Sequence, residues 1–171
     1  MSESIDQEIY NAALGKGFPT TSAKFLVAQA RHETANYTSN VFKLNNNLFG
    51  MKFANQPLAT KGSPAPSSEG GVYAKYNSPS DSIKDQVDRY FVRTMGGVTF
   101  DQLKASQTPL EYATNLKKRG YFTDTTDNYV RGIERGLLRI KVIDIVKKNY
   151  GKIILGITLV GYSIYLYTKK R

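Results

Sequence analysis

The sequence predicts a mainly α-helical domain with one β-hairpin, followed by a C-terminal transmembrane helix. Several segments place apolar residues at helical spacing between capping residues and glycines, which is typical of amphipathic helices. A segment rich in Pro, Ser and Gly, residues 54–71, separates two short extended stretches and indicates a hairpin. Residues 150–168 form an apolar run with one charge, Lys152, and the run is long enough to cross a bilayer as a helix.

The length and composition favour one domain with a shorter appendage. The chain has 171 residues, which we divide into a domain, residues 1–140, and a tail, residues 141–171. The absence of cysteine excludes disulfides, cysteine nucleophiles and thiolate metal sites. A zinc site or a Ser-His-Asp triad would depend on the single histidine, His32. Nothing in the sequence requires a metal or an organic cofactor, and we expect neither.

The net charge of +10 lies largely in the tail, which has seven of the 24 basic residues and one of the 14 acidic residues. Tyrosines lie near both ends of the apolar run and lysines precede it, as at membrane interfaces. Counted from Arg131, more basic residues precede the run than follow it, so the positive-inside rule would keep the domain in the cytoplasm. The acidic N-terminus does not resemble a secretory signal.

The first predicted helix lies at the N-terminus. Ser4 is the expected N-cap, and Ile5, Ile9 and Leu14 lie roughly on one face.

The second predicted helix ends in a glutamate on its apolar side. Thr21 is the expected N-cap, and Leu26, Ala30 and Glu33 follow at i, i+4 and i+7. A carboxyl group at that position would have a raised pKa, because burial and the helix C-terminus both disfavour its charge. Such a group could act as a general acid, although a salt-bridged helix end is an equal alternative from periodicity alone. His32 points elsewhere and should be exposed.

A hairpin and further helices follow. An asparagine run suits a loop or cap, and LFGMKF, residues 48–53, should begin the first strand of the hairpin. VYAKY, residues 72–76, should form the second. Apolar spacing predicts a helix over residues 78–95, and a capped pattern, with Thr108 as N-cap and Gly120 after the last turn, predicts another. A last helix begins near residue 128 and could continue into the membrane span.

Four segments, in this order, resemble the glucosaminidase domain of bacterial and phage cell-wall hydrolases, glycoside hydrolase family seventy-three, which has a lysozyme-like fold. The resemblance covers roughly residues 5–140. FLVAQARHET resembles the family's helix that ends in its catalytic glutamate, and NNNLFGMK resembles its Asn-Asn-Leu-Phe-Gly-Ile-Lys segment. VYAKYNSPSDSIKD resembles a strand that leads into a Ser-rich cap, and GYFTDTTDNYVRGI resembles Gly-Tyr-Ala-Thr-Asp-Pro-x-Tyr.

The resemblance implies three catalytic residues. Glu33 would be the general acid, and Glu69, in the hairpin, would be the second carboxylate. Tyr121 would line the cleft and orient water or an intermediate. These roles suit cleavage of a β-1,4 glycosidic bond in peptidoglycan, of the N-acetylglucosaminidase type.

The resemblance also implies a sugar-binding surface. Asn46, Asn47 and Phe49 would shape its floor. The family usually has Ser-Gly-Trp-Gly after its glutamate, whereas this chain has Thr-Ala-Asn-Tyr and no tryptophan. Tyr37 could supply the missing stacking surface.

Other functions remain open at this point. A lytic transglycosylase uses one glutamate on the same fold and leaves an anhydro product. A non-catalytic membrane-anchored virion protein is an alternative of another class. The domain has no basic-aromatic patch or recognition motif, so we expect no nucleic-acid partner.

The expected partners are a peptidoglycan strand and, through residues 150–168, a lipid bilayer. A wall hydrolase must reach the wall, although the charges around the span favour a cytoplasmic domain. A phage enzyme anchored in an internal virion membrane, beside other virion proteins, would resolve this conflict. Anchoring in the host inner membrane is the alternative.

Overall fold

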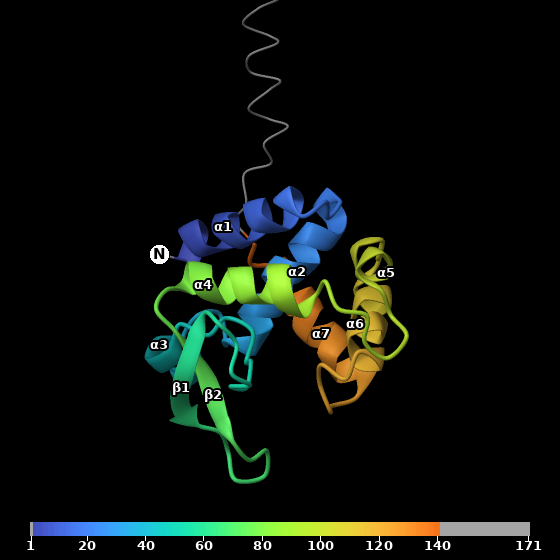
Figure 1. Cartoon of the computed structure of the whole chain (residues 1–171). Coiled ribbons are helices and arrows are strands. Elements are labelled where there is room, and N and C mark those ends of the chain that lie inside the picture. The colour runs from blue at the N-terminus through green and yellow to red at the C-terminus, as the bar shows by residue number, and fades with distance from the viewer. Residues whose placement is uncertain (1, 141–171) are drawn as a thin grey trace, which may run out of the picture. The chain divides into compact units, whose positions relative to one another are not determined.

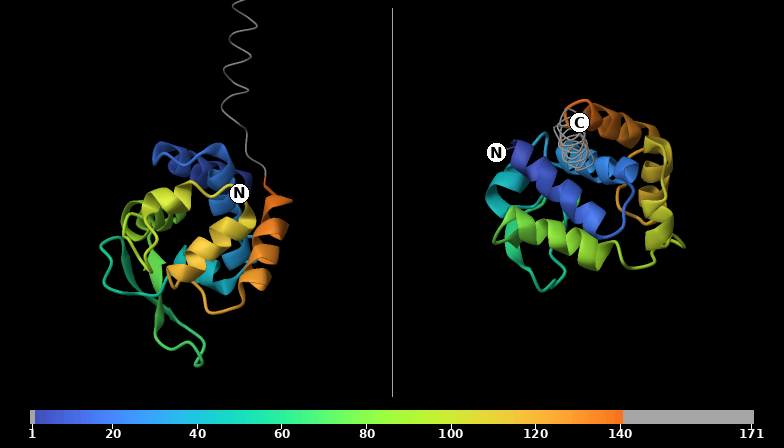
Figure 2. Two further views of the ribbon diagram at one scale, coloured as in Figure 1. Left: turned by 90° about the vertical axis from the view of Figure 1, so that its right-hand side faces the viewer. Right: turned by 90° about the horizontal axis from the view of Figure 1, so that it is seen from above.

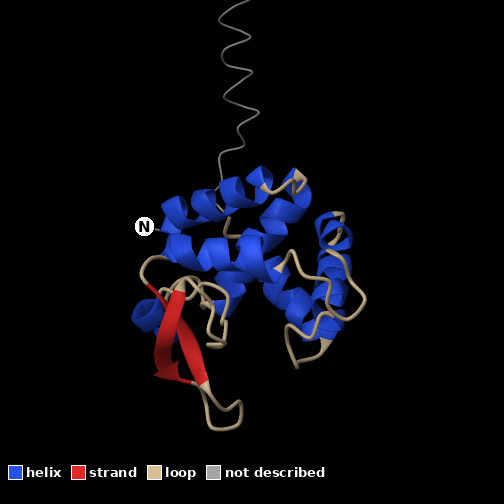
Figure 3. Ribbon diagram, viewed as in Figure 1, coloured by secondary structure: helices blue, strands red, loops and turns tan. Residues whose placement is uncertain are grey.

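The computed structural model describes residues 2–140. This part of the chain is mainly helical with one two-stranded antiparallel sheet (Figure 1, Figure 3). In chain order, its elements are α1 (Ser2–Gly15), α2 (Thr20–Glu33), α3 (Asn40–Asn45), β1 (Ala59–Pro64), β2 (Val72–Tyr76), α4 (Pro79–Lys84), the π-helical turn η1 (Asp85–Tyr90), α5 (Phe100–Lys104), α6 (Pro109–Lys118) and α7 (Thr126–Leu137). This architecture is consistent with the expected lysozyme-like fold.

Helix α2 is the centre of the core. Nine of its 14 residues are buried, between Ser22 and Arg31, so it is covered on nearly every side rather than on one face. Helices α1, α6 and α7 all pack against it (Figure 2). The C-terminal end of α2 therefore lies where several elements meet, which is where Glu33 is found.

Helices α2 and α7 pack unusually closely because α7 presents two glycines to α2. A Cβ atom on Gly136 would lie 2.6 Å from the main-chain oxygen of Ala28, and one on Gly132 would lie 2.4 Å from the His32 ring. Neither space can hold a side chain without displacing main chain or a ring. These two positions therefore fix how near the two helices lie.

The hairpin forms from different residues than the sequence predicted. Strand β2 is as expected, but β1 lies within the segment that its Pro and Gly content assigned to a loop, and Ala59 pairs with Tyr76. The LFGMKF segment is not a regular strand, since it contributes one isolated bridge, between Lys52 and Tyr73. The prediction of a strand there is wrong, because β2 pairs along its length with β1 instead.

Two predicted N-caps are wrong and two predicted helices are confirmed. Helix α1 already begins at Ser2, and α2 has Pro19 as its N-cap residue, so Ser4 and Thr21 lie inside helices. Helix α6 begins as predicted, with the Thr108 side chain accepting a hydrogen bond from the Glu111 amide. The helix predicted over residues 78–95 is present as α4 and η1.

The C-terminal end of the described region is not a continuous helix. Helix α7 ends at Leu137 and a turn follows, so the continuous helix into a membrane span that the sequence allowed is not found. Within residues 2–140, no helix is both long and apolar enough to cross a bilayer. The predicted span, residues 150–168, lies outside the described residues, and the boundary at residue 140 stays a prediction.

Candidate active site

The Glu33 carboxyl group lies where α2, α7 and the asparagine-rich segment meet. The Tyr129 hydroxyl of α7 donates a hydrogen bond of 2.6 Å to Glu33 Oε1. The other oxygen lies against Gly50, because a Cβ atom there would be 3.4 Å from Oε2. Gly50 has φ +63°, so a side chain at this position would also strain the main chain. Elements distant in sequence thus surround one carboxyl group.

Burial makes the Glu33 carboxyl group a weaker acid than an ordinary glutamate. The residue as a whole keeps part of its surface exposed, but protein atoms surround its carboxyl group, and burial raises its pKa to about 7. The hydrogen bond from Tyr129 lowers the pKa and the charge of Glu69 raises it, both less than burial does. A carboxyl group with this pKa is protonated in about half of the molecules at neutral pH, as a general acid requires.

Tyr129, rather than Tyr121, is the tyrosine bonded to Glu33. Tyr129 is buried and Phe122 stacks on its ring at 3.9 Å. The Tyr121 hydroxyl donates to the main-chain oxygen of Phe49 at 2.5 Å, and its ring lies 6.5 Å from that of Tyr129. Sequence reasoning missed Tyr129, although the family segment that it resembles ends in a second tyrosine and Tyr129 lies on the buried face of α7.

Glu69 lies in the loop between β1 and β2 and is exposed. Lys52 Nζ forms an ion pair of 2.8 Å with Glu69 Oε2 and lies 4.5 Å from the centre of the Tyr73 ring. Burial and the charges of Glu69 and Glu33 raise the pKa of Tyr73. Glu69 and Glu33 are therefore near enough to interact electrostatically, and Lys52 holds the hairpin loop against the LFGMKF segment.

The residues predicted to form a sugar-binding floor are mostly inside the protein. Asn47 is fully buried, and its side-chain amide donates to the main-chain oxygens of Met51 and Ala74. Phe49 is also buried, and Asn46, partly exposed, bonds the end of β2 in a left-handed conformation. Asn47 and Phe49 have no surface for a sugar, so their predicted binding role is wrong. They hold the segment that brings Gly50 to Glu33.

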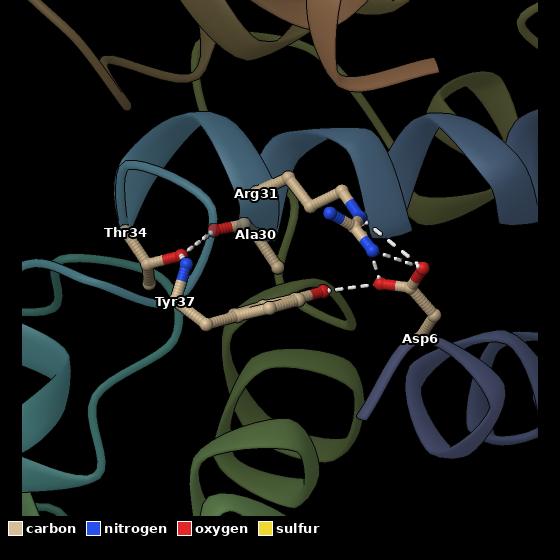
Figure 4. Close-up of polar contacts among 5 residues, drawn as sticks. All are labelled: Asp6, Ala30, Arg31, Thr34 and Tyr37. Atoms are coloured by element: carbon tan, nitrogen blue, oxygen red, sulfur yellow. Dashed lines mark hydrogen bonds and ion pairs between the residues drawn. The ribbon is translucent and has the colours of Figure 1, made fainter. Parts of the chain in front are cut away.

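Tyr37 is likewise a structural residue. Only 8 % of its surface is exposed, and its hydroxyl donates a 2.6 Å hydrogen bond to Asp6. The Arg31 guanidinium lies 5.1 Å from the centre of its ring and forms an ion pair of 2.7 Å with Asp6 (Figure 4). The predicted stacking of Tyr37 on a sugar does not agree with this burial. Instead, the Asp6–Arg31–Tyr37 cluster joins α1 to the end of α2.

The chain reverses after Glu33 through three consecutive residues in the left-handed region. Ala35, Asn36 and Tyr37 have φ of 47°, 59° and 66°, which residues with a Cβ atom adopt at a cost. The Asn36 amide donates to the main-chain oxygen of Arg31. The Tyr37 amide donates to the hydroxyl of Thr34, as Figure 4 shows. These bonds hold the strained turn and end α2 at Glu33.

Replacing Ala35 with glycine should stabilise the protein by roughly 0.5–1 kcal/mol, because glycine adopts positive φ without the steric cost. The same change at Ala12, inside α1, should destabilise it by about the same amount. Urea unfolding of both variants measures the two effects. Equal destabilisation by both would contradict the proposed strain at residue 35.

His32 is exposed, as expected, and its ring meets that of Tyr129 edge to face, with 5.1 Å between the ring centres. Among the described residues, no group of three or more His, Cys, Asp or Glu side chains could hold a metal ion.

A protein-family model described as glucosaminidase, mannosyl-glycoprotein endo-beta-N-acetylglucosaminidase, matches residues 18–142. No curated protein matches the chain. A solved peptidoglycan hydrolase from Sphingomonas sp. A1 is 23% identical with a TM-score of 0.57, over 81% of this chain and 94% of that one. A type VI secretion system effector–immunity complex from Pseudomonas protegens contains a chain that is 19% identical with a TM-score of 0.52, over 80% and 91%. These likenesses show a shared fold.

Proposed function

The chain belongs to the glucosaminidase family, and we propose that it cleaves a β-1,4 glycosidic bond in the glycan strands of peptidoglycan, with Glu33 as general acid. The family makes the chain a glycosidase. The observation that most directly supports Glu33 is its carboxyl group, which is enclosed beside Tyr129 and Gly50 and has a pKa raised to about 7. The peptidoglycan hydrolases among the proteins of similar fold support the choice of substrate.

In this proposal Glu33 protonates the oxygen of the leaving sugar. Protonation is needed because an alkoxide is a poor leaving group at neutral pH. A carboxyl group of ordinary acidity would be almost fully ionised there, so the burial of Glu33 is what makes it a proton donor. Tyr129 fixes the direction of one oxygen and leaves Oε2, beside Gly50, to face the substrate.

Glu69 is our candidate for the second carboxylate. Its carboxylate forms an ion pair with Lys52, and it acts electrostatically on Glu33. In the proposed reaction Glu69 supports the attack of water on the anomeric carbon. Attack by the substrate's own N-acetyl group is the alternative and would need Glu33 alone. Tyr121 shapes this site through its bond to Phe49 rather than through Glu33.

The bond cleaved and the fate of the product distinguish the proposal from its rivals. Purified peptidoglycan should be digested with the full chain in mild detergent, and the released fragments should be analysed by mass spectrometry. We expect hydrated reducing ends of N-acetylglucosamine. Anhydro ends would identify a lytic transglycosylase, and binding without release would favour a non-catalytic wall-binding protein.

Replacing Tyr129 with phenylalanine should move the alkaline limb of the pH–activity profile to higher pH. The lost hydrogen bond stabilises the carboxylate, so its removal raises the pKa of Glu33 and keeps the acid protonated for longer. The Tyr121→Phe variant is the matched control, because that hydroxyl donates to a main-chain oxygen. The role given to Tyr129 fails if its variant leaves the limb unmoved or shifts it to lower pH.

We further propose a membrane-anchored, phage-type enzyme, carried in a virion membrane or inserted in the host inner membrane. This proposal rests on the apolar run of residues 150–168 and its basic flanks. Flotation of purified particles with lipid, followed by protease treatment, tests it. A chain that sediments without lipid would exclude the anchor.

A further inference from the structure

A second site candidate lies beside His32 at the C-terminal end of α2, and Glu33 does not line it. A hollow of about 300 Å³ lies between the end of α2, the left-handed turn and the second half of α7. His32, Arg135, Arg139 and Leu138 form much of its wall. Gly132 and Gly136 also line it, so part of its surface is bare main chain.

Two positively charged side chains beside this hollow, Arg135 and Arg139, lack acidic partners among the described residues. Within the described part of the chain, neither Arg135 nor Arg139 forms a hydrogen bond or an ion pair through its side chain. Arg31 also lines the hollow, but its guanidinium is bonded to Asp6. Like charges around one hollow repel each other, and an anion between them would remove that repulsion.

The lowered pKa of His32 agrees with a positive potential in the hollow. Burial and the charge of Arg135 lower the pKa of His32, and the exposed carboxylate of Asp124 opposes them with a smaller effect. The favourable interaction of one arginine with the C-terminal end of α7 explains a single positive charge there. It does not explain two unpaired guanidinium groups and an imidazole around a hollow.

We propose that this hollow binds a phosphate group esterified to a small alcohol, between Arg135 and Arg139. Guanidinium groups match the oxygens of phosphate with paired hydrogen bonds, and they keep their charge at every physiological pH. The volume exceeds what a bare ion needs. Leu138, 88 % exposed beside the charges, offers an apolar surface that the carbon atoms of an esterified alcohol can contact and a free ion cannot use.

The position of the hollow in the chain suggests where such a phosphate would come from. Arg139 lies 11 residues before the predicted membrane span at residue 150, and a chain of that length reaches about 40 Å at most. If the span is present, the hollow lies within reach of lipid headgroups, which present a glycerol phosphate. A soluble glycerol phosphate has the same chemistry, so the experiment must distinguish the two sources.

The single histidine makes a local measurement possible. The imidazole NMR signals of His32 are a local probe of the hollow, because the ring lines it, whereas binding of the whole chain to vesicles would also report on the basic tail. The full chain in phosphatidylcholine bicelles should be titrated with glycerol 3-phosphate, with inorganic phosphate, and with chloride at matched ionic strength. A second sample should contain phosphatidylglycerol in the bicelles.

We expect a saturable shift of the His32 signals with glycerol 3-phosphate and none with chloride. The double variant Arg135→Gln and Arg139→Gln should bind at least about tenfold more weakly, as expected when charged hydrogen bonds are lost. Arg131→Gln is the control for loss of positive charge: it removes one charge from α7 outside the hollow, where the double variant removes two beside it, and it should bind as the parent does.

The outcomes distinguish the sources and can overturn the site. A shift with phosphatidylglycerol bicelles assigns the site to the membrane, and a shift with the soluble phosphates alone assigns it to a soluble ligand; both support the proposal. The absence of a saturable response to any phosphate compound overturns it. An equal loss of response in the Arg131 variant also overturns it, since general charge would then explain the effect.

Discussion

Replacement of Glu33 by glutamine is expected to reduce peptidoglycan cleavage by roughly a hundred- to ten-thousand-fold, the usual contribution of a general acid. Glutamine keeps the shape of the side chain and can still accept the hydrogen bond from Tyr129. It has no proton to give to the leaving oxygen. Release of reducing ends from purified peptidoglycan measures the effect directly.

The same variant should become more stable, not less, above neutral pH. The pKa of Glu33 is raised from 4.5 to about 7 in the folded protein, so its contribution to stability is present below pH 4.5 and is lost as the pH rises through 7. Removing the charge should therefore increase the free energy of unfolding at pH 8 by roughly 1–3 kcal/mol and change it little at pH 4.

Glu134→Gln is the matched control for both measurements. Glu134 is exposed on α7 and should tolerate the change with full activity and an unchanged stability. A Glu33→Gln protein that keeps its activity would end the catalytic proposal. One that is inactive but also unstable at pH 8 would show that the loss arises from misfolding.

Replacement of Asp6 by alanine is expected to lower the free energy of unfolding by about 3–5 kcal/mol, as when one partner of a buried ion pair is removed. Asp6 is fully buried, and its carboxylate accepts hydrogen bonds from Arg31 and Tyr37 (Figure 4). The variant would leave the Arg31 guanidinium buried without its anion. Urea unfolding at pH 7 measures the loss.

Two further variants distinguish the effect of burying the Asp6–Arg31 ion pair from the effect of its charge alone. Asp88 forms an ion pair of 2.8 Å with Lys16, but both side chains are nearly half exposed, so Asp88→Ala should cost less than about 1 kcal/mol. Replacing Asp6 with leucine and Arg31 with methionine together should cost less than Asp6→Ala alone, because no charge is then left buried. A double variant less stable than the single one would contradict this account.

The regular elements could be predicted because their signals are local. The apolar spacing of Ile83, Val87 and Phe91 indicates a helix, and all three are buried. Thr108 and Gly120 define α6 through chemistry that acts within one turn. Strand β1 could not be predicted, since its composition is that of a loop and pairing with β2 alone makes it a strand.

Of the candidate site, only the buried carboxyl group of Glu33 could be predicted from the sequence. The position of Glu33 on an apolar stripe indicated a buried carboxyl group, but its bond to Tyr129 joins residues 96 positions apart. The burial of Asn47 and Tyr37 also depends on distant partners, which no local pattern reveals. Polar and aromatic residues near a catalytic motif resemble ligand contacts until the fold shows what they bond.

The glycine contacts between α2 and α7 have a consequence for proton transfer. A slip by one helical turn, about 5.4 Å, would bring Asn128 or Ile140 into a space that only glycine fits. The distance between the Glu33 carboxyl group and the Tyr129 hydroxyl is therefore set by the glycine contacts between α2 and α7, and not by the hydrogen bond that joins them. In the proposed mechanism, Glu33 would therefore lose and regain its proton without reorganisation of its surroundings, and successive catalytic cycles would begin from the same geometry.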